Sequence, residues 1–254
     1  MLSAFSFNGK AELYDKFRPI YSERYINLLS SLGIEQNSCL ADVGAGTGKH
    51  SATLLKLSAH LYCIEPNPEM LSICRRNLND SKKDIRFICS SAESMPIPNN
   101  SIHFITVAQA FHLFDPKKCL CEFSRVLTPN GKVIITWQSK NPNTSFFTDT
   151  EKVISKYCPS YNRQLHVPRL TPYSYENFFP NNSFDYYYFG DDNYEEQTEE
   201  IFLGRTLSAS YSLTPNDENY RSYVSSLQEV FHEHSCNGVI CSSLSTIVYI
   251  GSLN

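Results

Sequence analysis

The sequence contains no apolar run that approaches the roughly 20 residues needed to cross a bilayer, so nothing in it predicts a transmembrane helix. It also lacks a basic run, and its formal net charge of -4 argues against the phosphate neutralisation that drives nucleic-acid binding. Residues 1–10 lack the charged start and apolar centre of a signal peptide. We therefore expect a cytoplasmic protein with a small-molecule substrate and no nucleic-acid or membrane partner. The oligomeric state is left open.

No C-x-x-C pair occurs among the nine cysteines. Four of them fall within predicted strands, where buried free thiols are expected: Cys39, Cys63, Cys89 and Cys241. The His232-Glu233-His234 cluster has H-x-H spacing rather than the i, i+4 pair of a helical zinc site, so a solvated helix face is expected there. The acids between 191 and 200 predict a solvated turn and a helix start. The sequence predicts no metal site.

Glycine is scarce, yet the ten glycines include three at alternate positions directly after an apolar run over 38–43: Gly44, Gly46 and Gly48. The run predicts a strand, and the amphipathic segment 51–57 predicts a helix. Glycine in the turn between them allows positive φ and removes the Cβ that would keep a ligand away, while the helix start offers unpaired N–H donors. The dinucleotide fingerprint would need glycine at position 49, which is Lys, so that motif is excluded.

A second predicted strand, over 60–65, ends in an acid roughly 20 residues after the first glycine, which is the spacing of a ribose-binding carboxylate. Glu65 is the expected diol ligand, because one ionised carboxylate can accept hydrogen bonds from both ribose hydroxyls. Pro66-Asn67-Pro68 then turns the chain into the next helix. Both features lie at the C-terminal ends of strands, where ligands of open α/β sheets bind.

Alternation of strands and helical stretches predicts a parallel, doubly wound α/β sheet. The expected strands cover about 38–43, 60–65, 85–89, 102–107 and 131–137, and 184–189 and 241–251 are also strand-like. With 254 residues and 41% hydrophobic content, we expect one domain with a substantial core. Its parts are a core over 36–138, an N-terminal cap over 1–33 and a substrate lid over about 141–180, with a helix over 148–157.

Four further motifs make the chain resemble the class I S-adenosylmethionine (SAM)-dependent methyltransferases, in the small-molecule group with a methyltransferase type 11 domain. The motifs are YDKFRPIY at 14–21, SSAESMP at 90–96, AQAFHLFD at 108–115 and EFSRVLTPNG at 122–131. This resemblance covers about 14–137. It implies a Rossmann-like sheet of seven strands, five parallel and two in a C-terminal antiparallel hairpin, with SAM as the cofactor.

Three positions depart from the family pattern. Ser91 stands where the family usually has an Asp that reaches the adenine amino group, His103 replaces an Asp in the fourth strand, and Leu113 replaces a Trp. None of these changes removes the glycine turn or Glu65.

The resemblance also implies the site residues. Tyr14 and Arg18 are expected to clasp the methionine carboxylate, and His112 is the expected base or acceptor-positioning residue, with Tyr14 as a second catalytic candidate. Surface or backbone-bonding roles stay open for these residues and for Gln109. The full set expected to bind the cofactor is Tyr14, Arg18, Asp42, Gly44, Ala45, Gly46, Gly48, Glu65, Pro66, Asn67, Met70, Ser91, Ala92, Glu93, Ala108 and Gln109.

Methyl transfer from SAM is an in-line displacement, in which correct placement of the acceptor can supply roughly 7–11 kcal/mol. Aromatic faces tolerate the sulfonium while excluding water, and Tyr14, Phe111 and Trp137 are candidates for this. The expected reaction is methyl transfer to an oxygen, nitrogen or carbon atom of a metabolic or natural-product acceptor. Two alternatives stay open: an enzyme of another class that uses SAM as scaffold for cyclisation or rearrangement, and a non-enzymatic SAM-binding protein.

Overall fold

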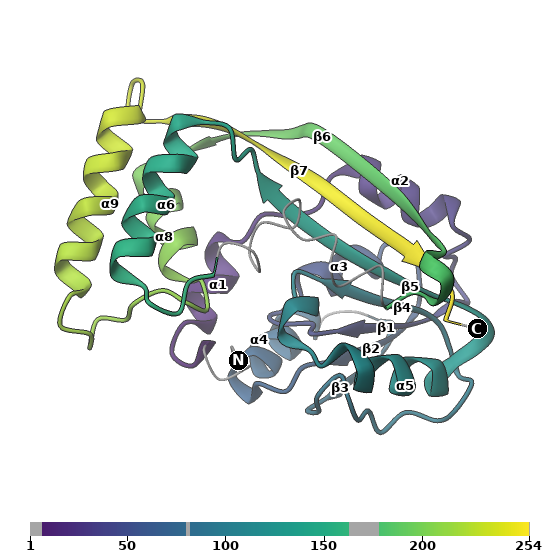
Figure 1. Ribbon diagram of the computed structural model, residues 1–254. Coiled ribbons are helices and arrows are strands. Elements are labelled where there is room, and N and C mark those ends of the chain that lie inside the picture. The colour runs from purple at the N-terminus through teal and green to yellow at the C-terminus, as the bar shows by residue number, and fades with distance from the viewer. Residues whose placement is uncertain (1–6, 80–81, 163–177, 254) are drawn as a thin grey trace.

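The computed structural model describes residues 7–79, 82–162 and 178–253, and a seven-stranded sheet lies at its centre (Figure 1). The strand order is β3-β2-β1-β4-β5-β7-β6. Five strands are parallel: β1 (Cys39–Val43), β2 (His60–Ile64), β3 (Asp84–Ile88), β4 (Ile102–Ala108) and β5 (Leu127–Lys140). Strand β7 (Ile240–Gly251) runs antiparallel between β5 and β6 (Phe184–Gln197). The predicted fold class is confirmed.

Helices cover both faces of this sheet, which explains why its central strands are apolar without a polar side. Alternate residues of β1 show the division: Leu40 packs toward one hydrophobic cluster and Ala41 toward the other. The first cluster includes side chains from α2 (Glu23–Ser31), α3 (Lys49–Leu54) and α4 (Pro68–Leu78). The second includes side chains from α5 (Pro116–Val126).

Local chemistry sets where these helices begin. Asn67 caps α4 by accepting hydrogen bonds from two backbone N–H groups, and Asp115 caps α5 in the same way, with proline next in each case. The predicted helix over 51–57 instead begins at Lys49, after Gly48 in the left-handed conformation, and ends at Leu54. Backbone bonds of the i to i+3 type follow, so the chain continues as a tighter turn.

Strands β5, β6 and β7 are longer than predicted, and one end of each extends to a group of helices beyond the five-stranded parallel part (Figure 1). This group consists of α6 (Ser145–Tyr157), α8 (Glu199–Leu207) and α9 (Tyr220–His234), which share one hydrophobic cluster. The N-terminal helix α1 (Ala11–Phe17) packs against α8 and α4. The predicted helix over 148–157 therefore lies inside α6. The stretch 163–177 of the predicted lid lies outside the described residues.

Two expectations about side chains were wrong. Glu195 does not lie in a solvated turn, because it is part of β6 and its carboxylate holds both terminal nitrogens of Arg205. All nine cysteines are free, but of the four predicted to be buried only Cys63 is buried, because Cys39 is half-buried and Cys89 and Cys241 are exposed. Cys89 lies just past the end of β3, an edge strand, and Cys241 lies where β7 leaves the core. Among the described helices, none has both the length and the apolar character to cross a bilayer.

Candidate active site

The turn between β1 and α3 has the backbone conformation that its glycines predicted. Gly44, Gly46 and Gly48 all have positive φ, at +74°, +57° and +86°. A Cβ added at Gly44 would lie 2.5 Å from the Ala110 Cβ, and one at Gly48 would lie 2.9 Å from the Cys74 Sγ. At Gly46 the nearest atom, a ring carbon of Tyr14, is 4.0 Å away. Two of the glycines therefore allow close packing within the protein, and Gly46 leaves space open.

Glu65 lies directly after β2, and its carboxylate is fixed by the backbone. One oxygen accepts a hydrogen bond from the Gly46 N–H at 3.0 Å, and the other accepts from the Asn67 N–H at 2.8 Å. Burial raises the pKa of the Glu65 carboxyl, and these two hydrogen bonds oppose the rise. The side chain thus ties the end of β2 to the glycine turn after β1.

A cavity of about 220 Å³ lies over the ends of β1, β2 and β4. Most of the predicted cofactor residues line it: Tyr14, Gly44, Gly46, Glu65, Pro66, Met70, Ser91, Ala92, Glu93, Ala108 and Gln109. The lining also includes four residues that the sequence analysis did not assign: Phe7, Ala110, Leu113 and Phe114. Ala110, Leu113 and Phe114 belong to the motif at 108–115, so the motif was a signal that could have placed them in the cavity wall. Nothing in the sequence indicated Phe7.

Other predicted cofactor residues support this cavity from behind. Asp42 is 1% exposed and accepts hydrogen bonds from His50, Ser51 and Thr106, so it ties β1 to α3 and β4. Asn67 uses its side-chain oxygen to cap α4. Within the described residues, the predicted members that are not in the cavity lining are Arg18, Asp42, Ala45, Gly48 and Asn67. Strand alternation explains Asp42, because its side chain points to the α3 face of the sheet.

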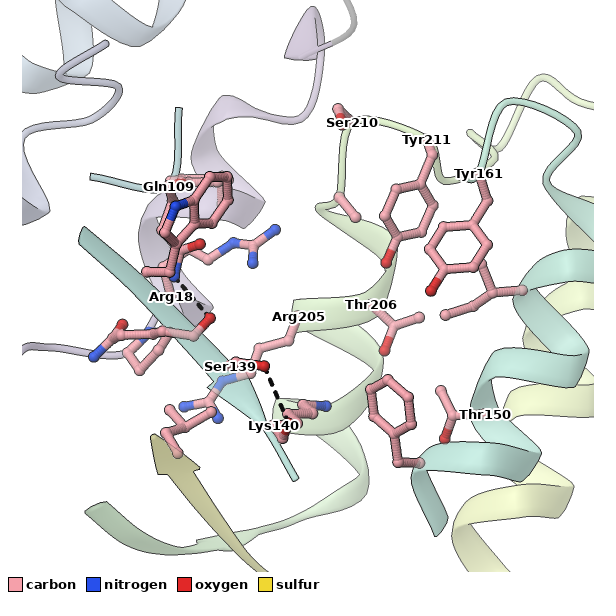
Figure 2. A pocket seen from close by; sticks show the side chains of 18 of the residues that line it. Arg18, Gln109, Ser139, Lys140, Thr150, Tyr161, Arg205, Thr206, Ser210 and Tyr211 are labelled. Carbon is pink, nitrogen blue, oxygen red and sulfur yellow. Dashed lines mark hydrogen bonds between the residues drawn. The ribbon is translucent and has the colours of Figure 1, made fainter. Parts of the chain in front are cut away.

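A second cavity, of about 240 Å³, adjoins the first, and the two share Phe7, Tyr14 and Gln109 in their walls. Its remaining walls come from β5, α6, α8 and the turn after α8 (Figure 2). Arg18 lies in this wall, with its guanidinium carbon 4.6 Å from the centre of the Tyr14 ring. Tyr14 and Arg18 therefore lie side by side near the junction of the cavities. A joint contact of these two residues with the methionine carboxylate, as predicted, needs such proximity.

Gln109 holds an unusual position at this junction. Its φ of +60° is in the left-handed region, which costs a residue with a side chain some backbone strain. Its N–H donates to the Thr136 carbonyl and its side-chain amide donates to the Gln138 carbonyl, both at 2.9 Å. These bonds to β5 hold Gln109 between the two cavities.

His112, the predicted base, lies in the wall of the second cavity and not of the first. It belongs to the short 3₁₀ helix Phe111–Leu113, and its ring lies 5.3 Å, centre to centre, from the ring of Trp137. Phe111 is buried in the core rather than in either cavity wall. Of the three aromatic residues proposed to face the sulfonium, Tyr14 and Trp137 therefore line the second cavity.

Sequence reasoning missed the polar side of the second cavity. Lys140, Glu151, Tyr161, Arg205 and Tyr211 all contribute to it. Lys140 ends β5 but lies three residues beyond the predicted strand over 131–137, and the others come from distant parts of the chain. Over residues 7–79, 82–162 and 178–253, no group of three or more His, Cys, Asp or Glu side chains is arranged to hold a metal ion.

Comparisons with known proteins agree with this architecture. Residues 41–135 match the methyltransferase domain family. An uncharacterized methyltransferase of Mycobacterium bovis is 28% identical over 151 residues, which cover 59% of this chain and 59% of that protein. An uncharacterized methyltransferase-like protein of Schizosaccharomyces pombe is 26% identical over 154 residues, or 59% of this chain and 56% of that protein. The chain thus spans less than two thirds of the curated relatives that it matches.

Solved structures show the same fold. A type II methyltransferase candidate from Anaeromyxobacter dehalogenans superposes with a TM-score of 0.61 at 15% identity, covering 93% of this chain and 98% of that one. The YcgJ protein of Bacillus subtilis has a TM-score of 0.57 at 18% identity, covering 91% of this chain and 99% of that one. These likenesses extend beyond the matched domain into the helical group and the C-terminal hairpin.

Proposed function

We propose that this chain is a class I SAM-dependent methyltransferase that transfers a methyl group from SAM to a small-molecule acceptor. The match of residues 41–135 to the methyltransferase domain family and the similarity to an uncharacterized methyltransferase of Mycobacterium bovis support this proposal. The observation that carries the proposal is the pair of adjoining cavities. One has the glycine turn and Glu65 in its wall, the other is larger and has many aromatic side chains, and Tyr14 and Gln109 belong to both. Such a pair can hold a donor and an acceptor so that their reacting groups meet.

The first cavity has the groups that the cofactor needs. Glu65 would accept from the ribose hydroxyls, since each of its oxygens keeps accepting capacity beyond the backbone bond it already makes. Gly46 presents backbone without a side chain, so a ligand can approach closely. Ser91 would offer a hydroxyl toward the adenine. Arg18 and Tyr14 would meet the methionine end, where guanidinium can pair with a carboxylate.

SAM supplies an electrophilic methyl group on a sulfonium, so the protein has to place the acceptor in line with it. Tyr14 and Gln109 lie in the walls of both cavities, and His112 lies in the wall of the second, where an acceptor would bind. The His112 imidazole would take the acceptor proton if the nucleophile is a hydroxyl, or orient the nucleophile if no proton is lost. The aromatic wall keeps water from competing as a nucleophile.

The first test is a calorimetric titration of dialysed protein with SAM and with S-adenosylhomocysteine, with NADH as the negative control. We expect saturable binding of the first two and none of NADH. No binding of either, by protein shown to be folded and free of ligand, would refute the proposal. An acceptor screen with a radiolabelled methyl group follows. Conversion of an acceptor without loss of SAM would favour a scaffold role, and absence of turnover over the whole screen would favour a binding protein.

A further inference from the structure

Lys140 stands out in the second cavity as a cation without an anion. It is the last residue of β5, and its side chain reaches the part of the cavity formed by α6 and α8 (Figure 2). Its Nζ lies 5.8 Å from the centre of the Phe146 ring and 5.7 Å from that of Phe202. No carboxylate in the described parts of the chain forms an ion pair with it. Two aromatic faces therefore support a charge that nothing described there neutralises.

The acid that interacts electrostatically with Lys140 is already engaged in another ion pair. Glu195 on β6 holds both terminal nitrogens of Arg205, and the Arg205 Nε donates to the Phe17 carbonyl at 2.8 Å. Arg205 and Glu195 thus cancel each other's charge and are held in place on both sides. An incoming ligand cannot recruit Arg205 without breaking these bonds, whereas Lys140 has no such ion pair among the described residues.

The other charged groups of this cavity do not change that balance. Lys49 on α3 lies 3.5 Å from Asp15, and Glu151 on α6 accepts a hydrogen bond from the Tyr161 hydroxyl at 2.8 Å. Among the described residues, the lining of the cavity thus has four cations, Arg18, Lys49, Lys140 and Arg205, and one acid, Glu151. Asp15 and Glu195 neutralise two of the cations from outside the lining. The cavity keeps an excess of positive charge.

This environment also acts on Lys140 itself. Burial lowers the pKa of its ammonium group to about 8, with repulsion from Arg205 and Arg18 adding to the effect and attraction from Glu195 opposing it. The group remains mostly protonated at pH 7. Lys140 is only half-buried, but a cation that has lost part of its hydration without gaining a partner is unfavourable, so an anion that pairs with it replaces the lost interaction with water.

Two tyrosine hydroxyls lie near the same space. Those of Tyr161 and Tyr211 point toward the middle of the cavity (Figure 2), but the Tyr161 hydroxyl already donates to Glu151. Burial raises the pKa of Tyr211 to about 12, so its hydroxyl keeps its proton and can donate to an anion. The hydroxyls of Thr150 and Thr206 instead donate to backbone carbonyls of their own helices.

We propose that the second cavity takes an acceptor with an anionic group, a carboxylate or a phosphate monoester, and that Lys140 forms the ion pair with it. The anionic group would lie toward α6 and α8, and the methylated atom would lie toward Gln109 and Tyr14. This inference rests on the proposed function, since it names the substrate class of the same site. It predicts that neutral analogues of an acceptor bind much more weakly.

The test uses matched probes on the full chain with saturating S-adenosylhomocysteine. The probes are 4-hydroxybenzoate, its neutral counterpart 4-hydroxybenzamide, and phenyl phosphate, each titrated by calorimetry. We expect at least one of the two anions to bind at least tenfold more tightly than the amide. The anion that binds identifies whether the site prefers a carboxylate or a phosphate. Equal binding of all three probes, or no saturable binding of either anion, would overturn the proposal.

Three variants assign the effect to Lys140. Lys140→Met should weaken anion binding at least tenfold, whereas Lys140→Arg should keep it within about threefold. Lys156→Met is the matched control, because Lys156 is an exposed lysine of α6 outside the cavity lining, and it should bind as the unaltered protein does. Circular dichroism and the S-adenosylhomocysteine affinity verify that each variant is folded. An unchanged anion affinity in Lys140→Met would refute the role of this side chain.

The pH dependence of anion binding distinguishes an ion pair with the Lys140 ammonium group from a packing contact with its side chain. The affinity for 4-hydroxybenzoate, whose carboxylate is fully ionised above pH 6, should be level from pH 6 to 7.5 and fall by up to about tenfold per pH unit above pH 8, as Lys140 loses its proton. Lys140→Arg should show no fall up to pH 10.

The titration with S-adenosylhomocysteine alone distinguishes a failure of the acceptor-class proposal from a failure of the methyltransferase proposal. If the cofactor product binds and the anions do not, only the acceptor class is wrong, and the reverse result would refute the methyltransferase proposal alone.

Discussion

Alanine substitutions at Gly44 and Gly46, with Gly33 as a control outside the turn, should separate the effect of the β1–α3 turn on stability from its role in cofactor binding. Gly33, Gly44 and Gly46 all have positive φ, so each alanine variant bears the same conformational cost of roughly 1–2 kcal/mol. They differ in what the new Cβ meets. At Gly33 nothing lies within 4 Å, at Gly44 the Ala110 Cβ lies at 2.5 Å, and at Gly46 only the Tyr14 ring lies at 4.0 Å.

The magnitudes follow from these distances. Gly33→Ala, the matched control, should lower the free energy of unfolding by about 1–2 kcal/mol. Gly44→Ala adds an overpacking cost of about 1–3 kcal/mol, because Ala110 cannot rotate its methyl group away, which makes about 2–5 kcal/mol in total. Gly46→Ala should match the control in stability. Its methyl group intrudes on the cofactor cavity. A steric cost of about 1–3 kcal/mol there raises the dissociation constant of the ligand roughly five- to 150-fold.

Urea unfolding without ligand and calorimetry with S-adenosylhomocysteine measure the two quantities. Gly33→Ala should bind the ligand as the unaltered protein does. If Gly44→Ala were no less stable than Gly33→Ala, the close packing at the turn would be wrong. If Gly46→Ala bound within threefold of the control, its place in the cofactor site would be wrong.

Three further predictions concern single side chains. Glu65→Ala should weaken S-adenosylhomocysteine more than tenfold, and a change of less than about threefold, under 1 kcal/mol, would remove its ribose role. His112→Ala should lower turnover at least tenfold with cofactor affinity within twofold, and unchanged turnover would leave it a structural residue. Lys140 has a pKa of about 8 in the folded protein against 10.5 in the unfolded chain, so the unfolded chain holds more protons between these values. Stability therefore gains from this group as pH rises through that window. Unfolding curves at pH 7.5 and 10 should show this gain lost in Lys140→Met, and an unchanged difference would contradict the lowered pKa.

The first cavity was largely predictable because its chemistry is local. A glycine turn and the acid after the next strand come together whenever two consecutive parallel strands are neighbours, as β1 and β2 are. Asp42 shows where that reasoning stops. Its position at a strand end was correct, but alternation of side chains says only which residues share a face, and the packing of α3 decides which face meets the ligand.

The sequence alone determined the five parallel strands, the glycine turn and the position of Glu65 after a strand, because strand periodicity, positive φ and short spacing are properties of neighbouring residues. The C-terminal antiparallel hairpin was expected only from the family resemblance. Only the tertiary structure decided the second cavity and its charge. Lys140 lies more than 50 residues before Glu195 and Arg205 in the chain. The three residues come together because β7 pairs with both β5 and β6, while α8 follows β6 back to the cavity. Contacts of that range depend on the packing of whole elements, for which no spacing rule exists.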